Sequence, residues 1–498
     1  MSISTSTEIK KTALEAYFET FRQNILGIDQ TFVSPYGTKD IVYVDWTASG
    51  RLYRPIEEKM MNEFGPYVAN THTETTYSGT LMTKAYHKAR KIIKNHVNAG
   101  ADDVFLPCGT GMTGAVNKFQ RILGLKIPEG LKDSVTINDK DRPVVFISHM
   151  EHHSNQTSWI ETIATVEVIP CDDEGMLCLE NLEILLNKYK DTEVKIASVT
   201  SCSNVTGIKT DYHAVAKLMH QHDGLCFVDF ACSAPYVEID MHPEDDEAYL
   251  DAVFFSPHKF LGGPGTNGVL IFDSKLYHNT VPDNPGGGTV SWTTPWGDHK
   301  FLDNIEDRED GGTPGFLQVI KTSLAVKLKE KMGIKNMLQR EEEIVDYIFK
   351  SLKNKPNISI LADHIEHRLG VISLIIGDLH HELAVKILND RFGIQSRGGC
   401  SCAGTYGHHL LQIDQQKSNE IIDRLEDGTC ELKPGWVRFS IHPTTSTDEI
   451  TYVCNSIIAL SENYKEWMKD YTSKDGKYIH KSEELNPSIC ISENWFEL

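Results

Sequence analysis

The sequence predicts an α/β fold with a large, mainly parallel sheet domain and a smaller C-terminal α/β domain. Between about residues 40 and 310, short apolar runs alternate with helix-like stretches, which is typical of a parallel sheet covered by helices. A Gly/Pro-rich stretch at 282–297 interrupts this alternation, and a second, shorter α/β pattern follows a long helical stretch at 315–352. A chain of 498 residues with 40% hydrophobic residues is long enough to form both domains.

Four apolar runs are the predicted strands of the large domain, because each has the length and composition of a buried strand. They are VVFIS (144–148), KIASVTS (195–201), LCFVDF (225–230) and AVFFS (252–256). Between two of them a helix is predicted at 211–222, with apolar residues on one face and Gly224 just beyond its end.

The small domain is predicted from three further segments. LGVISLII (369–376) has the pattern of a strand, and ELAVKILNDRF (382–392) that of a helix that stops before Gly393. QIDQQKSNEIIDRLEDGT (412–429) is predicted as an inserted helix, whose inward-facing residues are expected to be Ile421, Ile422 and Leu425.

The two ends of the chain are predicted to lie outside these domains. Near the N-terminus, Thr5 and Glu8 have the spacing of a helix capping box. The apolar face of that helix is predicted to comprise Leu14, Tyr17, Phe18, Phe21 and Ile25. Residues beyond about 465 turn polar and irregular, so a loosely packed tail is expected. The predicted divisions are an N-terminal helical segment (1–39), the large domain (40–314), the small domain (315–464) and a C-terminal extension (465–498).

Composition and charge exclude several classes of partner. The formal net charge of -21 repels nucleic-acid phosphates and anionic membranes, so neither is an expected partner. No apolar run approaches the roughly 20 residues needed to span a bilayer, and the N-terminus lacks the apolar core of a secretory signal. The eleven cysteines are scattered and odd in number, which favours reduced thiols and a cytoplasmic location.

A lysine directly after a predicted strand is the first candidate catalytic residue. In SPHKFLGGPG (256–265), Lys259 is flanked by a hydroxyl, an imidazole and glycines. A lysine whose pKa is lowered by burial can form an imine with an aldehyde, while Ser256 and His258 can reach a phosphate. The alternative is a solvated charge in a glycine-rich loop.

Two more strand ends carry groups that suit the same phosphorylated pyridine cofactor. Asp229 ends LCFVDF thirty residues before Lys259, about one strand–helix–strand unit away, and its carboxylate can keep a pyridine nitrogen protonated. Its alternative role is to cap the next helix. In CGTGMT (108–113), backbone N–H groups near Gly111 and the Thr110 hydroxyl can bind a phosphate at a helix N-terminus.

Two further segments supply a ring and an amide. His152, in HMEHHSN (149–155), can lie flat against a cofactor ring, although the His and Glu residues of this segment also allow a metal site. Asn204, in SCSNVTG (201–207), can hydrogen-bond a ring oxygen or the substrate.

In combination these segments resemble the class V branch of the fold-type-I pyridoxal-phosphate enzymes, and within it the cysteine desulfurase and selenocysteine lyase group. The resemblance extends from about 44 to 443. The segments that carry it are YVDWTASG (43–50), CGTGMT, EHHSN, SNVTG, VDFAC, SPHKFLGGPG, GGTPG (311–315), RGGCSCAG (397–404) and VRFSIHP (437–443).

The resemblance implies that pyridoxal 5′-phosphate is held as a Schiff base on Lys259, with Asp229 against the pyridine nitrogen and the His152 ring stacked on the cofactor. It implies phosphate contacts from residues that include Thr313, which the family supplies from the other subunit, so a homodimer with shared active sites is expected. The full set of implied cofactor-binding residues is Thr110, Gly111, His152, Asn204, Asp229, Cys232, Ser256, His258, Lys259 and Thr313.

The resemblance also implies a substrate site and a nucleophile. Arg438 matches the arginine that binds the substrate carboxylate, with Asn204 and Arg397 as further substrate contacts; a structural salt bridge is the alternative role of Arg438. Cys402 falls at the position of the desulfurase nucleophile. The implied reaction takes sulfur, or selenium, from L-cysteine and gives alanine and an enzyme persulfide, with a sulfur-acceptor protein as a possible partner.

The sequence departs from the family pattern at two places. Cys232 replaces the usual polar partner of the ring oxygen, a contact that Ser233 can take over. At the nucleophile loop Cys400 accompanies Cys402, where desulfurases of this branch have one cysteine, so a second thiol is available to relay or resolve a persulfide. Alternatively Cys400, Cys402, His408 and His409 could be metal ligands, although no resident metal is predicted.

Other functions remain open on the sequence alone. The GGGTV run (286–290) and the paired cysteines, Cys400 and Cys402, also resemble the N-terminal part of molybdenum cofactor sulfurases, which use the same desulfuration step. The lysine site is equally compatible with an aminotransferase, an epimerase or another β-lyase of class V. The alternative that is not an enzyme is a non-catalytic scaffold or metal-binding protein with this fold.

Overall fold

The computed structural model describes residues 12–71, 73–426, 433–474, 477–482 and 495–497. The Thr5 and Glu8 capping box lies outside these residues. Two compact units are present. The large unit comprises Ala48–Ser203 and Lys209–Lys335, and the small unit comprises Met1–Thr47, Asn204–Ile208 and Asn336–Leu498. Within the described part of the chain, no helix is long and apolar enough to cross a membrane.

The large unit is built on a seven-stranded sheet in the order β4-β10-β9-β8-β7-β5-β6. Only β10 runs antiparallel to its neighbours β4 and β9, so the predicted fold class is confirmed. The strands are β4 (Asp103–Cys108), β5 (Val144–Ser148), β6 (Thr165–Ile169), β7 (Lys195–Thr200), β8 (Leu225–Asp229), β9 (Ala252–Phe255) and β10 (Gly268–Asp273). All four predicted strands are present within one residue of their predicted ends.

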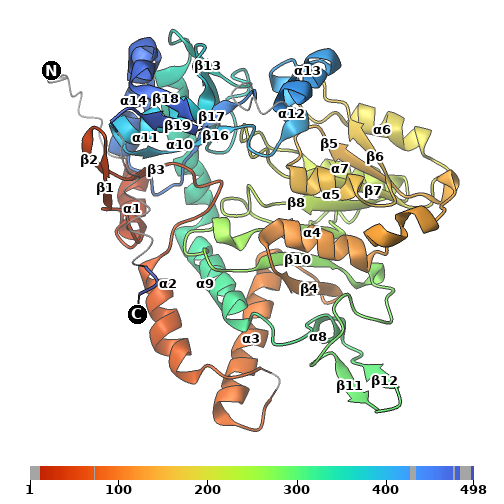
Figure 1. The fold of residues 1–498 in the computed structure, drawn as a ribbon. Helices are drawn as coiled ribbons and strands as arrows, with labels where there is room; N and C mark the ends of the chain where they lie inside the picture. Colours follow the sequence, from red (N-terminus) through yellow and green to blue (C-terminus); the bar gives the residue numbers. More distant parts are fainter. Residues whose placement is uncertain (1–11, 72, 427–432, 475–476, 483–494, 498) are drawn as a thin grey trace. The chain divides into compact units, whose positions relative to one another are not determined.

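Helices cover the sheet (Figure 1). Among them α4 packs on β9 and β10, while α7 packs on β7 and β8. The helices of the large unit are α2 (Arg54–Lys59), α3 (Tyr77–His96), α4 (Gly111–Ile122), α5 (His153–Ile160), α6 (Leu179–Lys188), α7 (Tyr212–Gln221), α8 (Ile305–Arg308) and α9 (Phe316–Met332). A hairpin of β11 (Val290–Thr293) and β12 (His299–Phe301) begins in the Gly/Pro-rich stretch and ends just after it.

An aromatic cluster fixes α4 on the sheet. The ring of Phe119 lies 5.0 Å from Phe227 of β8, 6.0 Å from Phe254 of β9 and 4.8 Å from Phe272 of β10, measured between ring centroids. All four side chains are buried, and aromatic pairs at these separations add attraction beyond the burial of apolar area. The cluster therefore sets the position of the α4 N-terminus at the edge of the sheet where β8 and β9 end.

The small unit contains the four-stranded antiparallel sheet β13-β14-β17-β16. The predicted strand at 369–376 is β14 (Val371–Ile376), and the predicted helix at 382–392 is α11 (His381–Phe392), which ends at Gly393 in the left-handed conformation. The other elements are α1 (Ala13–Arg22), β1 (Thr31–Ser34), β2 (Gly37–Asp40), β3 (Val42–Tyr43), α10 (Ile334–Leu352), β13 (Ile358–Ile360), β15 (Ile394–Gln395), β16 (Arg397–Gly399), α12 (Gly404–Leu410), α13 (Gln415–Glu426), β17 (Trp436–Ser440), α14 (Thr447–Trp467), β18 (Tyr471–Lys474) and β19 (Lys477–His480).

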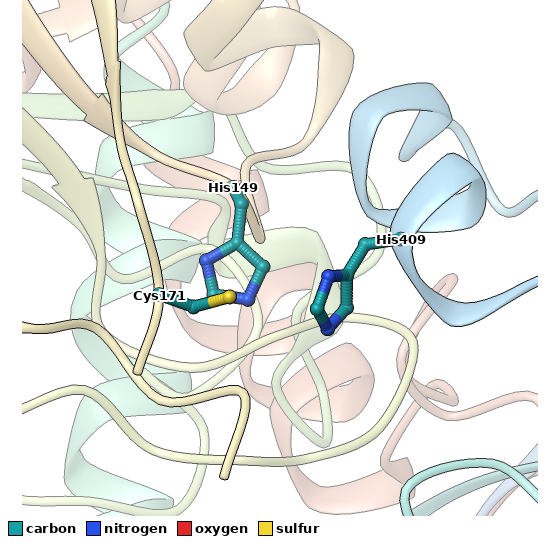
Figure 2. Close-up of side chains that lie close together, drawn as sticks. All are labelled: His149, Cys171 and His409. Atoms are coloured by element: carbon teal, nitrogen blue, oxygen red, sulfur yellow. The ribbon is translucent and has the colours of Figure 1, made fainter. Parts of the chain in front are cut away.

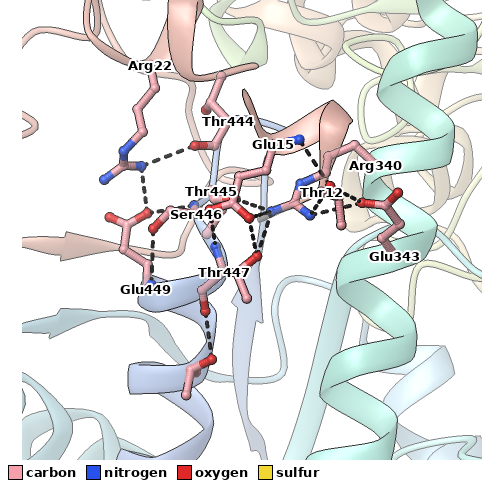
Figure 3. Close-up of polar contacts among 11 residues, drawn as sticks. Thr12, Glu15, Arg22, Arg340, Glu343, Thr444, Thr445, Ser446, Thr447 and Glu449 are labelled. Atoms are coloured by element: carbon pink, nitrogen blue, oxygen red, sulfur yellow. Dashed lines mark hydrogen bonds and ion pairs between the residues drawn. The ribbon is translucent and has the colours of Figure 1, made fainter. Parts of the chain in front are cut away.

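Buried charges attach α1 to the rest of the small unit (Figure 3). Glu15 accepts the backbone N–H of Thr447 at 3.1 Å and lies 3.4 Å from the Arg340 guanidinium. Arg340 also contacts Glu343 at 3.0 Å, and Arg22 contacts Glu449 at 2.6 Å. Because removal of one member of a buried ion pair leaves its partner uncompensated, this network fixes α1 in one position.

Two predictions about the small unit are wrong. The inserted helix exists as α13, but Ile422 is 50% exposed rather than inward-facing. Residues beyond 465 do not form a loose tail throughout, because β18 and β19 pair as a hairpin and Tyr471 is 6% exposed within the hydrophobic core. The sequence shows that α13 has an apolar face and that the residues beyond 465 are mostly polar. It does not show which other elements pack against either segment.

Candidate active site

The candidate cofactor residues of the large unit follow neighbouring strands. Asp229 is the last residue of β8, and Lys259 lies four residues after the end of β9 in a short helical turn, Pro257–Lys259. Strands β8 and β9 are parallel neighbours with Asp229 in register with Phe254. The carboxyl ends of such strands form the common binding edge of open α/β sheets.

Asp229 is a buried carboxyl that accepts a hydrogen bond from the Ala231 N–H at 2.8 Å. Burial raises the pKa of Asp229 to about 6, against the opposing effects of the Ala231 hydrogen bond and the charge of Lys259. A buried carboxylate becomes favourable when a cationic partner is next to it. The protonated nitrogen of a pyridine ring is such a partner, so this residue fits the expected cofactor.

The N-terminus of α4 is arranged for an anion. The backbone N–H of Met112 donates to the Ser256 hydroxyl at 2.8 Å, and Thr110, the N-cap residue, makes no side-chain capping hydrogen bond. Gly111 has φ of 60° and lies so close to Ser256 that an added Cβ would be 2.9 Å from its hydroxyl oxygen. A helix N-terminus presents N–H groups and a positive dipole end to a phosphate.

A cavity of about 720 Å³ adjoins this helix start and is lined by Thr110 and Thr313 among other residues. The Thr313 hydroxyl accepts a hydrogen bond from Asn70 at 3.4 Å, and Thr313 precedes α9 in the same chain. The basic groups of the cavity are already paired, since Lys118 contacts Glu309 at 2.7 Å. Hydroxyls, side-chain amides and backbone N–H groups are therefore the donors that this cavity offers to a phosphate.

His152 is the N-cap residue of α5, and its ring Nδ1 accepts the Ser154 N–H at 3.1 Å. This bond places the proton of the neutral ring on Nε2. Behind it, Glu151 is fully buried, accepts the Thr200 N–H at 2.8 Å and has a pKa raised to about 8 by burial. Glu151, which the sequence pattern indicates only as a metal ligand, is an internal anchor between β5 and β7.

His258 and Gly50 shape the lysine loop. Burial, followed by the charge of Lys259, lowers the pKa of His258 to about 4, so the ring is neutral at physiological pH. The carbonyl of His258 accepts the Gly50 N–H at 2.9 Å, and an added Cβ at Gly50 would lie 2.0 Å from the carbonyl oxygen of Phe260. The glycine of the YVDWTASG segment is thus required by close backbone contact with this loop.

Cys232 and Ser233 are both buried after β8. The Cys232 thiol is 3.7 Å from the Ser203 carbonyl oxygen, while the Ser233 hydroxyl is hydrogen-bonded to the hydroxyl of Ser201. The role of either residue at a ring oxygen stays a prediction.

The candidate substrate residues belong to the small unit. Arg438, in β17, donates to the Asp45 carboxylate at 2.8 Å and to the Asn204 carbonyl at 3.0 Å, and its side chain is 3% exposed. Arg397 contacts the same carboxylate at 3.3 Å. The Nε of Arg438 has no hydrogen-bond partner among the residues that the structure describes. Asp45, which no sequence motif indicates as a site residue, therefore forms ion pairs with both arginines.

The two candidate thiols line a second cavity, of about 380 Å³, in the small unit. Cys402 is exposed and Cys400 is half-buried, and neither forms a disulfide. The Asn204 side chain donates to the Ser401 carbonyl of this loop at 2.7 Å.

His408, one of the candidate metal ligands, is engaged in other hydrogen bonds. Both ring nitrogens of His408 are engaged, one with the Gly404 carbonyl at 2.8 Å and one with the Ser418 hydroxyl at 2.9 Å. Figure 2 shows His149 beside Cys171 in the large unit, with a ring nitrogen within 4.8 Å of the thiol.

The comparisons with known proteins agree with this arrangement. The model of the family "Aminotransferase class-V" matches residues 42–453. A probable cysteine desulfurase of Staphylococcus epidermidis is 28% identical over 371 residues, which cover 73% of this chain and 84% of the relative. A probable cysteine desulfurase of Staphylococcus aureus is 27% identical over the same length.

Solved structures share the fold. The apo structure of cysteine desulfurase from Thermococcus onnurineus NA1 superposes with a TM-score of 0.71 at 22% identity, covering 89% of this chain and 98% of that one. The cysteine desulfurase CsdA of Escherichia coli superposes with a TM-score of 0.68 at 20% identity, over 89% and 98% of the two chains.

Fold and strand-end residues together define an enzyme of the type that works with pyridoxal phosphate. The chain belongs to the aminotransferase class-V family. The family predicted from the sequence is confirmed, and the relatives and solved structures named above are similar to this chain in the way expected of the cysteine desulfurase group.

Proposed function

We propose that this protein is a pyridoxal 5′-phosphate-dependent cysteine desulfurase. The observation that carries the proposal is the position of Asp229 and Lys259, which lie at or just beyond the ends of adjacent parallel strands. A helix N-terminus suited to a phosphate begins at the same edge of the sheet. The names of the relatives supply the reaction, because they are probable cysteine desulfurases.

The residues of the large unit would hold the cofactor. Lys259 would bind its aldehyde carbon covalently, and the Asp229 carboxylate would keep its ring nitrogen protonated. Ser256, Thr110 and the α4 N-terminus would hold its phosphate. The bound cofactor supplies an electron-withdrawing ring that weakens bonds at the α- and β-carbons of an amino acid.

Residues of this chain would carry out proton transfer, substrate binding and sulfur transfer. Lys259 would remove and return a proton at the α-carbon of cysteine, and the His152 ring would keep the substrate side of the cofactor free of water. Arg438 would bind the substrate carboxylate, with Nε as the donor that the structure leaves unpaired among the described residues. Cys402, exposed in its loop, would take the sulfur as a persulfide and leave alanine.

Further parts of the proposal concern assembly and location. A homodimer in which Thr313 reaches the phosphate of the partner subunit is expected from the family, and Thr313 also lines the Thr110 cavity within one chain. The nine described cysteines are all free thiols, which suits a cytoplasmic protein in a reducing compartment.

The test is the conversion of cysteine by the cofactor-loaded protein. We expect alanine and sulfur in equal amounts, with sulfur release lost in Cys402→Ala and kept in the matched control Cys178→Ala. Full sulfur release by Cys402→Ala would show that Cys402 is not the nucleophile. Turnover of another amino acid but not of cysteine would identify a different reaction of class V.

A further inference from the structure

The two cysteines of the nucleophile loop occupy the first and third positions of a tight turn. The Ala403 N–H donates to the Cys400 carbonyl at 3.1 Å, which closes the turn over four residues. Ser401 has φ of 53° and Cys402 has φ of 56°. Positive φ at both central positions is the pattern of a type I′ turn, which usually has Asn or Gly there. A serine and a cysteine hold this conformation only because the surrounding structure imposes it.

Two buried donors impose the turn. The Asn204 side-chain amide donates to the Ser401 carbonyl at 2.7 Å, and the Trp436 indole N–H donates to the Ser401 hydroxyl at 3.1 Å. Both donors belong to residues with little exposure, and Trp436 begins β17. Ser401 is therefore fixed from the inside of the unit, whereas the thiols on either side of it line the 380 Å³ cavity.

The turn places the Cα atoms of the two cysteines at a separation that a disulfide can span. Residues at the first and third positions of a closed turn have Cα atoms within the roughly 4.4–6.8 Å that a disulfide spans. The same cavity is lined by Arg397, Lys433 and Glu382, and its two positive charges outnumber the one negative charge, which favours anionic sulfur species such as hydrosulfide. Cys400 has a defined place in this cavity, yet the desulfurase reaction proposed above needs only Cys402.

We propose that Cys400 is a resolving cysteine, which rests on the desulfurase function proposed above. After sulfur transfer, the Cys400 thiolate attacks Sγ of the Cys402 persulfide. The bond between Sγ and the terminal sulfur breaks, hydrosulfide leaves with both bonding electrons and takes up one proton to become hydrogen sulfide, and a Cys400–Cys402 disulfide forms. In this step the terminal sulfur is reduced and the Cys400 sulfur is oxidised, while Sγ of Cys402 keeps its oxidation level, so no other oxidant is needed.

The resolving step changes the product of the enzyme. Sulfur leaves as free sulfide rather than remaining on Cys402 for a protein acceptor. The disulfide is then reduced by an external thiol or dithiol, which supplies two electrons and two protons and returns both cysteines to the thiol state. The enzyme would thus use a thiol reductant as its second substrate.

A single-turnover experiment tests this step. Cofactor-loaded protein receives one equivalent of cysteine per chain without reductant, and alanine, sulfide and the mass of the peptide containing residues 400–402 are measured. For the wild type we expect nearly one alanine and one sulfide per chain, and a peptide that has lost two hydrogens. For Cys400→Ser we expect the same alanine, at least tenfold less sulfide, and a peptide that carries one extra sulfur on Cys402. Cys178→Ser should behave as the wild type.

The outcomes separate the two proposals. Alanine formation by Cys400→Ser shows that the variant is folded and active, so its retained persulfide is not an effect of misfolding. Wild-type protein that forms alanine but keeps the persulfide, or a Cys400→Ser variant that releases sulfide as the wild type does, overturns the resolving role alone. Absence of alanine in the wild type overturns the desulfurase function, and the resolving step with it.

Discussion

Asp229→Asn replaces a buried carboxyl at the end of β8 with a neutral side chain of the same size. In protein freed of cofactor, burial raises the pKa of Asp229 from 3.8 to about 6. This rise corresponds to about 3 kcal/mol in favour of the protonated form. Because the folded pKa lies above the unfolded value, the favourable contribution of Asp229 is complete below about pH 3.8 and is lost as the pH rises through 6.

Asparagine does not titrate, so the two proteins diverge as the pH rises. Between pH 4.5 and 7.5 the free energy of unfolding of Asp229→Asn, minus that of the wild type, should increase by about 2 kcal/mol. Urea unfolding of the cofactor-free proteins measures this difference, in which all other titrations cancel. The same substitution should weaken binding of pyridoxal phosphate, since the ring nitrogen loses its anionic partner.

Asp283→Asn is a control at a carboxyl whose pKa is shifted in the opposite direction. Burial of Asp283 is outweighed by the hydrogen bonds from Arg121 and the charge of Lys118, so the pKa of Asp283 is lowered. Its stabilising contribution is complete above the unfolded pKa of 3.8 and is lost only as the pH falls through the lowered folded pKa, so the difference for this variant should stay nearly constant between pH 4.5 and 7.5. A flat difference for Asp229→Asn, like that of the Asp283→Asn control, would refute the assignment of Asp229 as a buried carboxyl that requires a cation.

Three further substitutions probe the supporting structure. Gly111→Ala should weaken cofactor binding about tenfold in a spectroscopic titration, because the new Cβ would lie 2.9 Å from the Ser256 hydroxyl at positive φ. Asp45→Ala should lower the free energy of unfolding by about 3 kcal/mol in urea titrations, because it leaves the buried Arg438 guanidinium without its carboxylate. Tyr471→Ala should cost about 3 kcal/mol in the same assay, since this side chain belongs to the core of the small unit.

Matched controls make these results decisive. Gly130→Ala enters open space at an ordinary φ and should bind the cofactor normally. Tyr67→Ala removes a side chain that is 41% exposed and should change the free energy of unfolding by less than about 0.5 kcal/mol. Equal effects of Tyr471→Ala and Tyr67→Ala would show that the C-terminal hairpin does not pack as described, and an unchanged Asp45→Ala would remove the argument that Asp45 holds Arg438.

Strands and their ends were the most predictable features of the sequence. Buried strands such as β5 and β8 consist of apolar residues up to a polar last residue, Ser148 or Asp229, so their type and their limits are evident from composition. The positions of Asp229 and Lys259 followed, because parallel strands end at one edge of the sheet. The family resemblance added roles that spacing alone did not provide.

The remaining features depend on contacts that a sequence pattern does not specify. Ile422 shares a helix face with other apolar residues, but periodicity does not show whether another element covers that face. Tyr471 is one aromatic residue in a polar stretch, and only pairing of β18 with β19 makes its burial evident. Asp45 and Glu151 have partners far away in the sequence, so their ion pair and hydrogen bonds emerge only from the tertiary fold.

The central claim is that Lys259 binds pyridoxal phosphate, and its most direct test is the site of covalent attachment. The cofactor-loaded protein is treated with borohydride, digested, and its peptides are mapped by mass spectrometry. We predict one phosphopyridoxyl group per chain, on Lys259, and none at that site in Lys259→Ala. Attachment to a different lysine, or no attachment in a protein that contains the cofactor, would contradict the account.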